Sequence, residues 1–350
     1  MMEYFCGTRK YLYCLAALSL LLLVACSPAS SNKTPSPSSH HTAVSTVLPQ
    51  PTSQANDSAI DRPVVTTGCG RVSPITPGTS ADEMIDAHPR QAEGYTSRSY
   101  LIHVPIDYTL NHPIPVALIF HGYGGNPVGT EKSTGFSKLA DQQDFIAVYP
   151  QGLPDGPGGP SFWASIGPYD YGVDDALFVS DVLNRLQSEF CIDARRIYVT
   201  GFSNGGAMAA YLACTLGMRI AAFAPVSGNF YAIPGGCHPG RSLPILDIHG
   251  TADPILPYNG IPTSVNPRWP LPAIPDWLRD WAVRDGCTVG PVIFLRTSSA
   301  VGEQWTHCQA DGAVVHYRMI GEGHSWPRMI GSRSGTEAIW DFLETHTLPG

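Results

Sequence analysis

Residues 197–210 read Ile-Tyr-Val-Thr-Gly-Phe-Ser-Asn-Gly-Gly-Ala-Met-Ala-Ala, and this stretch decides the fold. A β-branched and aromatic run leads into Gly-x-Ser-x-Gly, and small residues typical of a helix continue to about residue 215. A serine hydroxyl is a weak nucleophile until a base removes its proton, and a sharp strand-to-helix turn exposes its Oγ. Gly201 and Gly205 carry no Cβ, so they permit this turn. The stretch therefore predicts a nucleophile elbow with Ser203 at its tip.

Short apolar runs alternate with helical patterns on both sides of the elbow. Residues 98–104 alternate like a half-exposed strand, whereas 116–120 and 145–149 are continuous and look buried on both faces. Further strands are expected at 197–200, 221–226, 245–249 and 314–320, and helices at 176–190, 204–215, 274–284 and 335–346. This order predicts an α/β fold with a mostly parallel sheet and helices on both faces. Such sheets bind ligands at the carboxyl ends of their strands.

The strand at 116–120 leads into His-Gly-Tyr-Gly-Gly-Asn, residues 121–126. Glycines in such a loop let backbone N–H groups approach a ligand, which is what an oxyanion hole requires. We expect one donor to be the amide of Asn204, directly after the nucleophile, because the helix that starts there aims its N–H groups at the developing charge. The other donor is expected in the 121–124 loop, at Tyr123.

A carboxylate that orients the base is expected at Asp253, in the loop after the strand 245–249. A carboxylate just past a strand end can reach a histidine on a neighbouring loop and hold its tautomer. Asp247 is the main alternative, but it lies inside the strand and suits a structural polar group. Asp174 and Asp175 precede the serine, whereas the expected chain order is serine, acid, histidine.

The general base is expected at His324, which stands in Gly-Glu-Gly-His-Ser-Trp-Pro at residues 321–327. This loop follows the last predicted strand, and Gly323 permits a close approach to Ser203. His121 and His249 also stand at strand ends, and we interpret them as residues that position loops. The other histidines of the domain, His316 among them, are expected to be surface or core residues.

Together these motifs resemble the polyhydroxybutyrate depolymerase and feruloyl esterase family of α/β-hydrolases. The resemblance covers about residues 68–346 and implies the α/β-hydrolase fold, a secreted serine esterase and the triad Ser203, Asp253 and His324. It does not choose between short-chain, hydroxyalkanoate and feruloyl or acetyl esters. The alternatives are a serine peptidase or thioesterase of the same fold, and a catalytically silent envelope lipoprotein.

Aromatic residues near the strand ends are candidates for substrate contacts. Trp326 and Trp163 are expected to offer platforms for a ring, and the Gly-, Pro- and aromatic-rich segments 153–173 and 259–275 are expected to wall the pocket. The acyl-enzyme chemistry requires no cofactor and no metal. A net charge of −8 argues against nucleic-acid partners.

The first 67 residues read as an export and tether region. Arg9 and Lys10 precede a short apolar run that predicts a signal peptide over residues 1–25. The run ends in Leu-Val-Ala-Cys, which resembles a bacterial lipobox, so Cys26 is expected to carry a lipid that is the only membrane contact. Residues 26–67 are rich in Ser, Thr and Pro and predict a disordered linker. The catalytic domain is then expected over 68–350, in a protein anchored to the cell envelope or released.

Six cysteines remain in the expected domain, and an even number in an exported protein suggests disulfides. Cys287 and Cys308 flank a stretch that could close as a local loop, so we expect them to pair. Cys214 stands at the end of the elbow helix and Cys237 in the next loop. Their pairing would leave Cys69 for Cys191, although six cysteines allow about 15 connectivities and the sequence alone does not choose.

Overall fold

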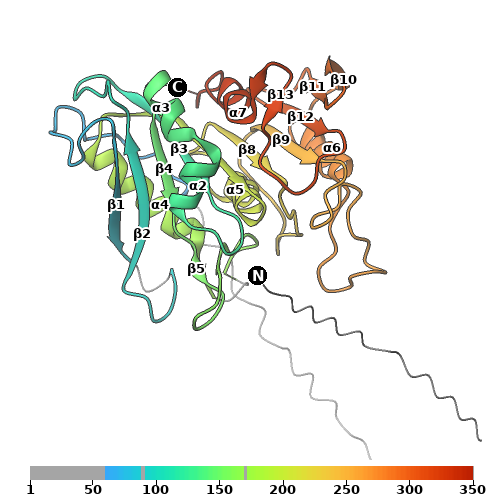
Figure 1. Ribbon diagram of the computed structural model, residues 1–350, viewed down its shortest axis with the longest axis horizontal. Helices are drawn as coiled ribbons and strands as arrows, with labels where there is room; N and C mark the ends of the chain where they lie inside the picture. The colour runs from blue at the N-terminus through green and yellow to red at the C-terminus, as the bar shows by residue number, and fades with distance from the viewer. Residues whose placement is uncertain (1–59, 88–90, 169–171, 350) are drawn as a thin grey trace, which may run out of the picture. The chain divides into compact units, whose positions relative to one another are not determined.

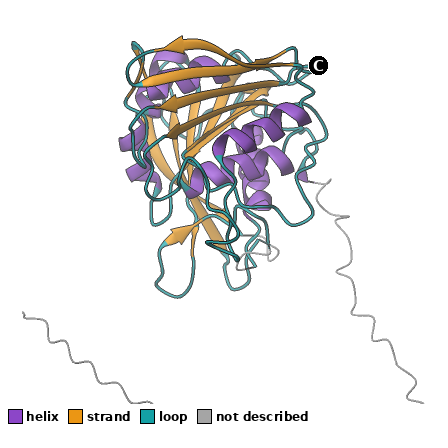
Figure 2. Ribbon diagram, turned by 90° about the vertical axis from the view of Figure 1, so that its right-hand side faces the viewer, coloured by secondary structure: helices purple, strands orange, loops and turns teal. Residues whose placement is uncertain are grey.

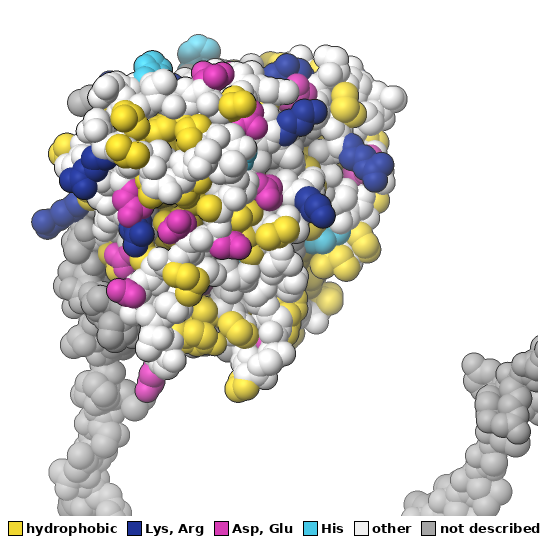
Figure 3. Space-filling model, turned by 60° about the vertical axis from the view of Figure 1, so that its left-hand side comes forward, with side chains coloured by type: hydrophobic (Ala, Val, Ile, Leu, Met, Phe, Trp, Pro, Cys, Tyr) yellow, Lys and Arg dark blue, Asp and Glu magenta, His cyan; other side chains and the backbone are white. Residues whose placement is uncertain are grey.

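The computed structural model describes residues 60–87, 91–168 and 172–349. The predicted signal peptide, Cys26 and most of the predicted linker lie outside these residues. Within them, none of the helices has the length and apolar character needed to cross a membrane. On the face shown in Figure 3, acidic and basic side chains are interspersed, so this face carries no large patch of one sign.

A ten-stranded sheet forms the centre of the domain, in the order β1-β2-β4-β3-β7-β8-β9-β12-β11-β10 (Figure 1). The six strands from β4 to β12 in this order run parallel, and antiparallel strands extend the sheet at both edges. The strands are β1 Thr79–Asp86, β2 Ser97–Val104, β3 Ile114–Phe120, β4 Ile146–Pro150, β7 Ile192–Phe202, β8 Ala222–Val226, β9 Pro244–Gly250, β10 Val289–Arg296, β11 Ala300–Thr306 and β12 Ala313–Met319. Two small hairpins pair β5 Leu153–Pro154 with β6 Ser161–Phe162, and β13 Met329–Ile330 with β14 Arg333–Ser334.

Helices cover both faces of the sheet (Figure 2). They are α2 Pro127–Thr134, α3 Phe136–Gln143, α4 Asp175–Glu189, α5 Asn204–Thr215, α6 Ile274–Arg284 and α7 Gly335–Leu343. In β3, Val116, Leu118 and Phe120 join the core cluster of α4, α5 and α6, while Ala117 and Ile119 join the cluster of α3 and α7. Alternate side chains of this strand thus point to opposite faces of the sheet, and both faces are covered. A strand in this position is therefore apolar along its whole length. The predicted α/β fold is confirmed.

The strand β2 is more buried than its polar alternation predicts. Its polar side chains find partners inside the protein: Arg98 Nη2 lies 2.6 Å from the Asp175 carboxylate, with both side chains fully buried, and His103 Nε2 lies 3.0 Å from Asp141. The positions that look solvent-facing in the sequence are therefore occupied by a buried ion pair at Arg98 and by a histidine–carboxylate contact at His103. Asp175 also accepts from the amide of Ala164 at 2.7 Å, so it serves the scaffold.

The folded domain begins before the expected boundary at residue 68. The amide of Thr67 donates to the Gln187 carbonyl of α4 at 2.9 Å, and Gln187 Nε2 donates to Val64 O at 2.7 Å. Asp61 accepts from the amide of Met218 at 2.8 Å. Residues 60–67 are therefore part of the domain, because they make specific hydrogen bonds to α4 and to Met218 just after the elbow helix, and Ile60 packs against the core.

Three disulfides join Cys69 to Cys191, Cys214 to Cys237, and Cys287 to Cys308. These are the pairs suggested by the positions of the cysteines along the chain. The Cys287–Cys308 bond closes the hairpin of β10 and β11, and Cys214–Cys237 ties the end of α5 to the loop after β8. In the chain-entropy view, the two bonds that close short loops stabilise the fold by about 3 kcal/mol each, and the bond between Cys69 and Cys191, 122 residues apart, by about 5 kcal/mol.

Candidate active site

Ser203 stands at a strained turn between β7 and α5. Its backbone has φ 57° and ψ −120°, a region that a residue with a side chain seldom adopts, and its amide donates to Val226 O at 2.9 Å. A Cβ on Gly201 would lie 2.3 Å from Gly205 O, and one on Gly205 would lie 2.3 Å from Phe120 O. Both glycines are therefore required by close backbone contacts, and the turn has the geometry of a nucleophile elbow.

Asp253 and His324 face one another at the carboxyl ends of β9 and β12. His324 Nδ1 lies 2.7 Å from Asp253 Oδ2, while Asp253 Oδ1 accepts from the amides of Ile255 and Leu256 at 2.9 and 2.8 Å. The carboxylate is buried, and three hydrogen bonds satisfy it and fix its direction. This arrangement holds the Nδ1 proton of His324 and leaves Nε2 to act on another group.

A second histidine supports the acid loop. His249 is buried at the end of β9, its Nε2 donates to Leu256 O at 2.8 Å, and the same nitrogen lies 3.6 Å from Asp253 Oδ2. It therefore fixes the loop that carries the carboxylate, as expected for a residue that positions a loop.

The loop with His324 is anchored to the acid loop. Gly321 donates its amide to Thr251 Oγ1 at 2.9 Å, and the amide of Ala252 donates to Glu322 O at 3.0 Å. The His324 ring lies 4.7 Å, centroid to centroid, from the ring of Phe202, which directly precedes Ser203. The structure thus brings the ring of the expected base into contact with the residue that precedes the expected nucleophile.

The loop after β3 lies against the elbow, since a Cβ on Gly122 would be 3.3 Å from the Cβ of Ser203. The amide of Gly124 donates to Ser161 O at 2.7 Å and that of Gly125 to Gly122 O at 2.9 Å, so neither is an oxyanion donor. The oxyanion donor expected from this loop is therefore the amide of Gly122 or of Tyr123. The second expected donor is the amide of Asn204 at the start of α5.

His121 sets the shape of this loop. Burial lowers the pKa of His121, so the ring is neutral at pH 7. Its Nε2 accepts from the amide of Gly152 at 2.9 Å, which leaves the proton on Nδ1 to donate to Gly122 O at 2.7 Å. A single histidine thereby joins the loop after β3 to the loop after β4.

Trp163 is not a substrate platform. The side chain is fully buried, its Nε1 donates to His121 O at 2.9 Å, and its ring packs edge-on against Phe120. The Asn204 side chain accepts from the Trp163 amide at 2.7 Å and donates to its carbonyl at 3.0 Å. No ring face remains for a ligand, and the residue instead clamps the elbow to the segment after β6.

Trp326 also lies away from Ser203. It is half-buried, its Nε1 donates to Thr336 Oγ1 at 3.1 Å, and its ring meets Phe136 of α3 edge-on. The cleft that it lines runs along α2, α3 and α7 and contains no member of the expected triad among its described lining residues. The structure therefore does not bring Trp326 to the nucleophile.

Sequence reasoning missed a buried chain of polar groups beneath the site. Tyr258 Oη lies 3.0 Å from His316 Nε2, and His316 Nδ1 lies 3.1 Å from the backbone oxygen of Asp247 and 3.0 Å from its carboxylate. Burial raises the pKa of Tyr258, so the hydroxyl keeps its proton and donates it to His316. Because Tyr258 lies in the same loop as Asp253, this chain ties the loop to β12. The sequence signal was the match of Asp247 with His316 across neighbouring strands.

Metal ligation has no counterpart in the part of the chain that the structure describes. Among residues 60–87, 91–168 and 172–349, no three His, Cys, Asp or Glu side chains gather closely enough to hold an ion.

Asp174, a rejected candidate for the acid, accepts from the amide of Leu177 at 2.9 Å and caps α4.

The sheet order, the elbow and the carboxylate–histidine pair at the strand ends define an α/β-hydrolase. Residues 111–265 match the family described as Phospholipase/Carboxylesterase, and the domain has the α/β-hydrolase fold.

Curated relatives carry esterase names. The chain is 30% identical over 253 residues to the bifunctional acetylxylan esterase/xylanase XynS20E of Neocallimastix patriciarum, across 71% of this chain and 34% of that protein. It is 28% identical over 257 residues to feruloyl esterase B of Piromyces equi, across 72% of this chain and 46% of the relative. The match thus spans less than half the length of either relative. The resemblance to feruloyl esterases is confirmed.

A solved structure supports the fold. An acetyl xylan esterase from Aspergillus awamori aligns with a TM-score of 0.57 and 16% sequence identity, over 75% of this chain and 99% of that chain.

Proposed function

We propose that this protein is a serine carboxylic-ester hydrolase that forms an acyl-enzyme on Ser203. The observation that carries the proposal is the 2.7 Å contact between His324 and Asp253, whose carboxylate has three hydrogen bonds. The His324 ring contacts Phe202, which precedes the strained elbow serine. A surface histidine has no need of a buried carboxylate with three hydrogen bonds, whereas a general base does.

In the proposed reaction, Ser203 Oγ attacks the ester carbonyl while His324 Nε2 takes its proton. The charge on the carbonyl oxygen is stabilised by the amides of Asn204 and Tyr123 and by the N-terminus of α5. His324 then gives the proton to the leaving alcohol, and the C–O bond breaks. Water repeats the sequence on the acyl-enzyme and releases the acid.

The proposed substrates are short-chain, hydroxyalkanoate or feruloyl and acetyl-type esters. The names of the relatives support the feruloyl and acetyl classes. The polyhydroxybutyrate depolymerase side of the resemblance stays a prediction.

A fluorophosphonate probe tests the chemistry, and an ester panel tests the substrate class. The probe should label Ser203, and labelling should vanish in Ser203→Ala while the circular dichroism spectrum stays unchanged. Acetyl, butyryl, hydroxybutyryl and feruloyl esters should be hydrolysed faster than matched amides and thioesters. Labelling without hydrolysis of any ester would instead favour the peptidase or thioesterase, and an unlabelled protein would favour the silent lipoprotein.

We also propose that the protein is exported and held at the cell envelope by a lipid on Cys26, which lies outside the described residues. Three disulfides support an oxidising compartment. Metabolic labelling with a clickable fatty acid in a bacterial host should mark the full chain, and Cys26→Ser should lose the label without losing esterase activity. A chain that enters the medium unlabelled would contradict the anchor.

A further inference from the structure

A short hairpin contacts both sides of the expected oxyanion hole. It consists of β5, β6 and the connecting residues 155–160. The amide of Gly152, just before β5, donates to His121 Nε2 at 2.9 Å. The backbone of Trp163, just after β6, bonds to the side chain of Asn204 at 2.7 and 3.0 Å. The hairpin therefore connects the loop after β3 to the start of α5.

Several hydrogen bonds hold the base of this hairpin against the loop after β3. Trp163 is fully buried, and its Nε1 donates to His121 O at 2.9 Å. The amide of Gly124 donates to Ser161 O at 2.7 Å, and the Ser161 hydroxyl donates in turn to the carbonyl of Gly125. These bonds fix the first and the last residues of the loop to the hairpin.

The middle of the loop, Gly122 and Tyr123, carries the candidate oxyanion donors. Their amides have to stay free of bonds within the protein in order to meet the charge on a substrate. Tyr123 also exposes 59% of its surface, so packing does little to hold it in place. A donor that moves loses part of its effect, because a hydrogen bond weakens steeply as its distance and angle depart from the optimum.

The tip of the hairpin makes a contact with this part of the loop. The hydroxyl of Tyr123 donates to Asp155 Oδ2, and the amide of Asp155 donates to Pro160 O at 3.0 Å, which closes the tip. A hydrogen bond to an ionised carboxylate is stronger than one between two neutral groups. Asp155 is also half-buried, so water competes less for it than for a fully exposed carboxylate. The contact therefore joins the middle of the loop to the hairpin.

We propose that Asp155 is a positioning residue for ester hydrolysis, because its bond to the Tyr123 hydroxyl holds the loop amide that stabilises the oxyanion. The proposal rests on the proposed esterase function. Asp155 acts through Tyr123, by fixing where the loop donor lies relative to the second donor at Asn204. The charge on the carbonyl oxygen develops only on the way to the tetrahedral intermediate. The contribution of Asp155 therefore belongs to the transition state and not to substrate binding.

A double-mutant cycle tests the pair. Asp155→Ala and Tyr123→Phe should each lower kcat on ethyl acetate about fivefold and leave KM within about twofold of the parent. The double variant should lose no more than either single variant, because both changes remove the same bond. Asp155→Asn should stay within about twofold of the parent, since its amide oxygen still accepts from the hydroxyl. Asp276→Ala, which removes an exposed aspartate bonded to Arg279 on α6, is the matched control and should change neither constant.

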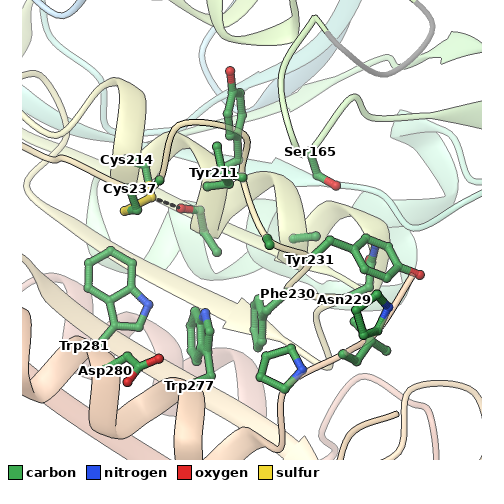
Figure 4. A pocket seen from close by; sticks show the side chains of 18 of the residues that line it. Ser165, Tyr211, Cys214, Asn229, Phe230, Tyr231, Cys237, Trp277, Asp280 and Trp281 are labelled. Carbon is green, nitrogen blue, oxygen red and sulfur yellow. Dashed lines mark hydrogen bonds between the residues drawn. A yellow bond between two sulfur atoms is a disulfide. The ribbon is translucent and has the colours of Figure 1, made fainter. Parts of the chain in front are cut away.

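A transition-state analogue distinguishes positioning from a structural role. A trifluoromethyl ketone adds to the serine as a hemiketal whose oxygen carries the charge, so its Ki should rise about fivefold in Asp155→Ala, in step with kcat/KM. A loss of folded protein would instead lower the number of sites that a fluorophosphonate titrates and leave Ki unchanged. Neither Asp155 nor Tyr123 belongs to the described lining of the cavity between Tyr211 and Trp277 in Figure 4, so these variants leave that cavity intact.

The outcomes separate the positioning role from the esterase function. An active parent with unchanged kcat and Ki in Asp155→Ala and Tyr123→Phe would overturn the positioning role and leave the function standing. A loss confined to KM would mean that Asp155 contacts the substrate, and additive losses in the double variant would mean that the two residues act separately; either result would overturn the proposal. A parent protein that hydrolyses no ester of the panel and does not react with the fluorophosphonate would overturn the function itself.

Discussion

Two aspartate–histidine pairs connect the same two elements of this protein, β9 with its following loop and β12 with its following loop. His324 Nδ1 lies 2.7 Å from Asp253, and His316 Nδ1 lies 3.0 Å from Asp247. The groups and the distances nearly match. The sequence left Asp247 as the main alternative for the acid, so the difference between the pairs decides where the chemistry is expected.

The pairs differ in what surrounds the second ring nitrogen. His316 is fully buried inside the sheet, and Tyr258 occupies its Nε2. His324 lies on a glycine-flanked loop and keeps 15% of its side chain exposed. Its imidazole ring contacts the ring of Phe202, the residue before Ser203. The histidine of such a pair can act as a general base only where it lies beyond a strand end, so that its Nε2 can reach a substrate.

The largest expected effect belongs to the exposed pair. Asp253→Asn should lower kcat on an acetyl ester by on the order of 10^4-fold, because the amide favours the wrong tautomer of His324. Thermal unfolding should change little, since the side chain can still accept from the two loop amides. Activity within tenfold of the parent would move the acid to Asp247.

The matched change in the buried pair should affect stability instead. Asp247→Asn should lower the free energy of unfolding by about 2 to 3 kcal/mol, because it removes the buried carboxylate 3.0 Å from His316 Nδ1 and leaves that nitrogen only the backbone oxygen of residue 247. Turnover at a temperature where the variant is folded should stay within about tenfold. Urea unfolding and ester hydrolysis measured on one preparation separate the two effects, and a 10^4-fold loss of turnover would contradict the division.

Breaking the link between the buried pair and the acid loop should have a smaller effect on stability and on turnover. Tyr258→Phe removes the hydroxyl that faces His316 Nε2, which should cost about 1 to 2 kcal/mol of stability. If this chain also positions Asp253, kcat should fall about threefold while KM is unchanged. Equal kcat in Tyr258→Phe and in the parent protein would show that the contact between Tyr258 and His316 supports the fold alone.

A third buried carboxylate has no histidine and sharpens the contrast. Burial raises the pKa of Asp285 to about 7 from 3.8, although the amide of Leu243 donates to it. The folded state therefore binds this proton more tightly than the unfolded state, so stability falls as the pH rises from about 4 to about 7 and stays at the lower level above pH 7. Asp285→Asn should stabilise the protein by about 1 to 2 kcal/mol at pH 8. Urea unfolding across pH should show this gain shrinking below pH 7 and disappearing near pH 4, and a gain that grows on acidification would contradict the assignment.

The parallel centre of the fold could be predicted from the sequence, and its edges could not. The helices at 204–215 and 274–284 have the predicted bounds, because small-residue and amphipathic patterns stop at clear breaks. The strand β1 is polar and lies at one edge with much of its surface exposed, so it shows no strong apolar pattern. The strand β10 is apolar but exposed at the other edge, where the pattern gives no information on pairing.

The candidate site could be predicted where local motifs define it. Ser203, Asp253 and His324 each follow a legible strand end, and the order of strands places β7, β8, β9 and β12 side by side. The ring contacts could not be predicted in this way. Nothing in the sequence distinguishes a buried tryptophan such as Trp163 from an exposed one, because burial depends on segments that are distant in the chain.

The disulfide between Cys69 and Cys191 has a mechanical consequence. Cys191 directly precedes β7 and Ser203 directly follows it, so the 11 residues of this strand, about 36 Å at the usual rise, separate the bond from the nucleophile. A tensile load carried along the chain upstream of Cys69 first meets the hydrogen bonds that residues 60–67 make with α4 and with Met218. Once these yield, the load reaches a covalent link at the amino end of a central strand, the end opposite Ser203.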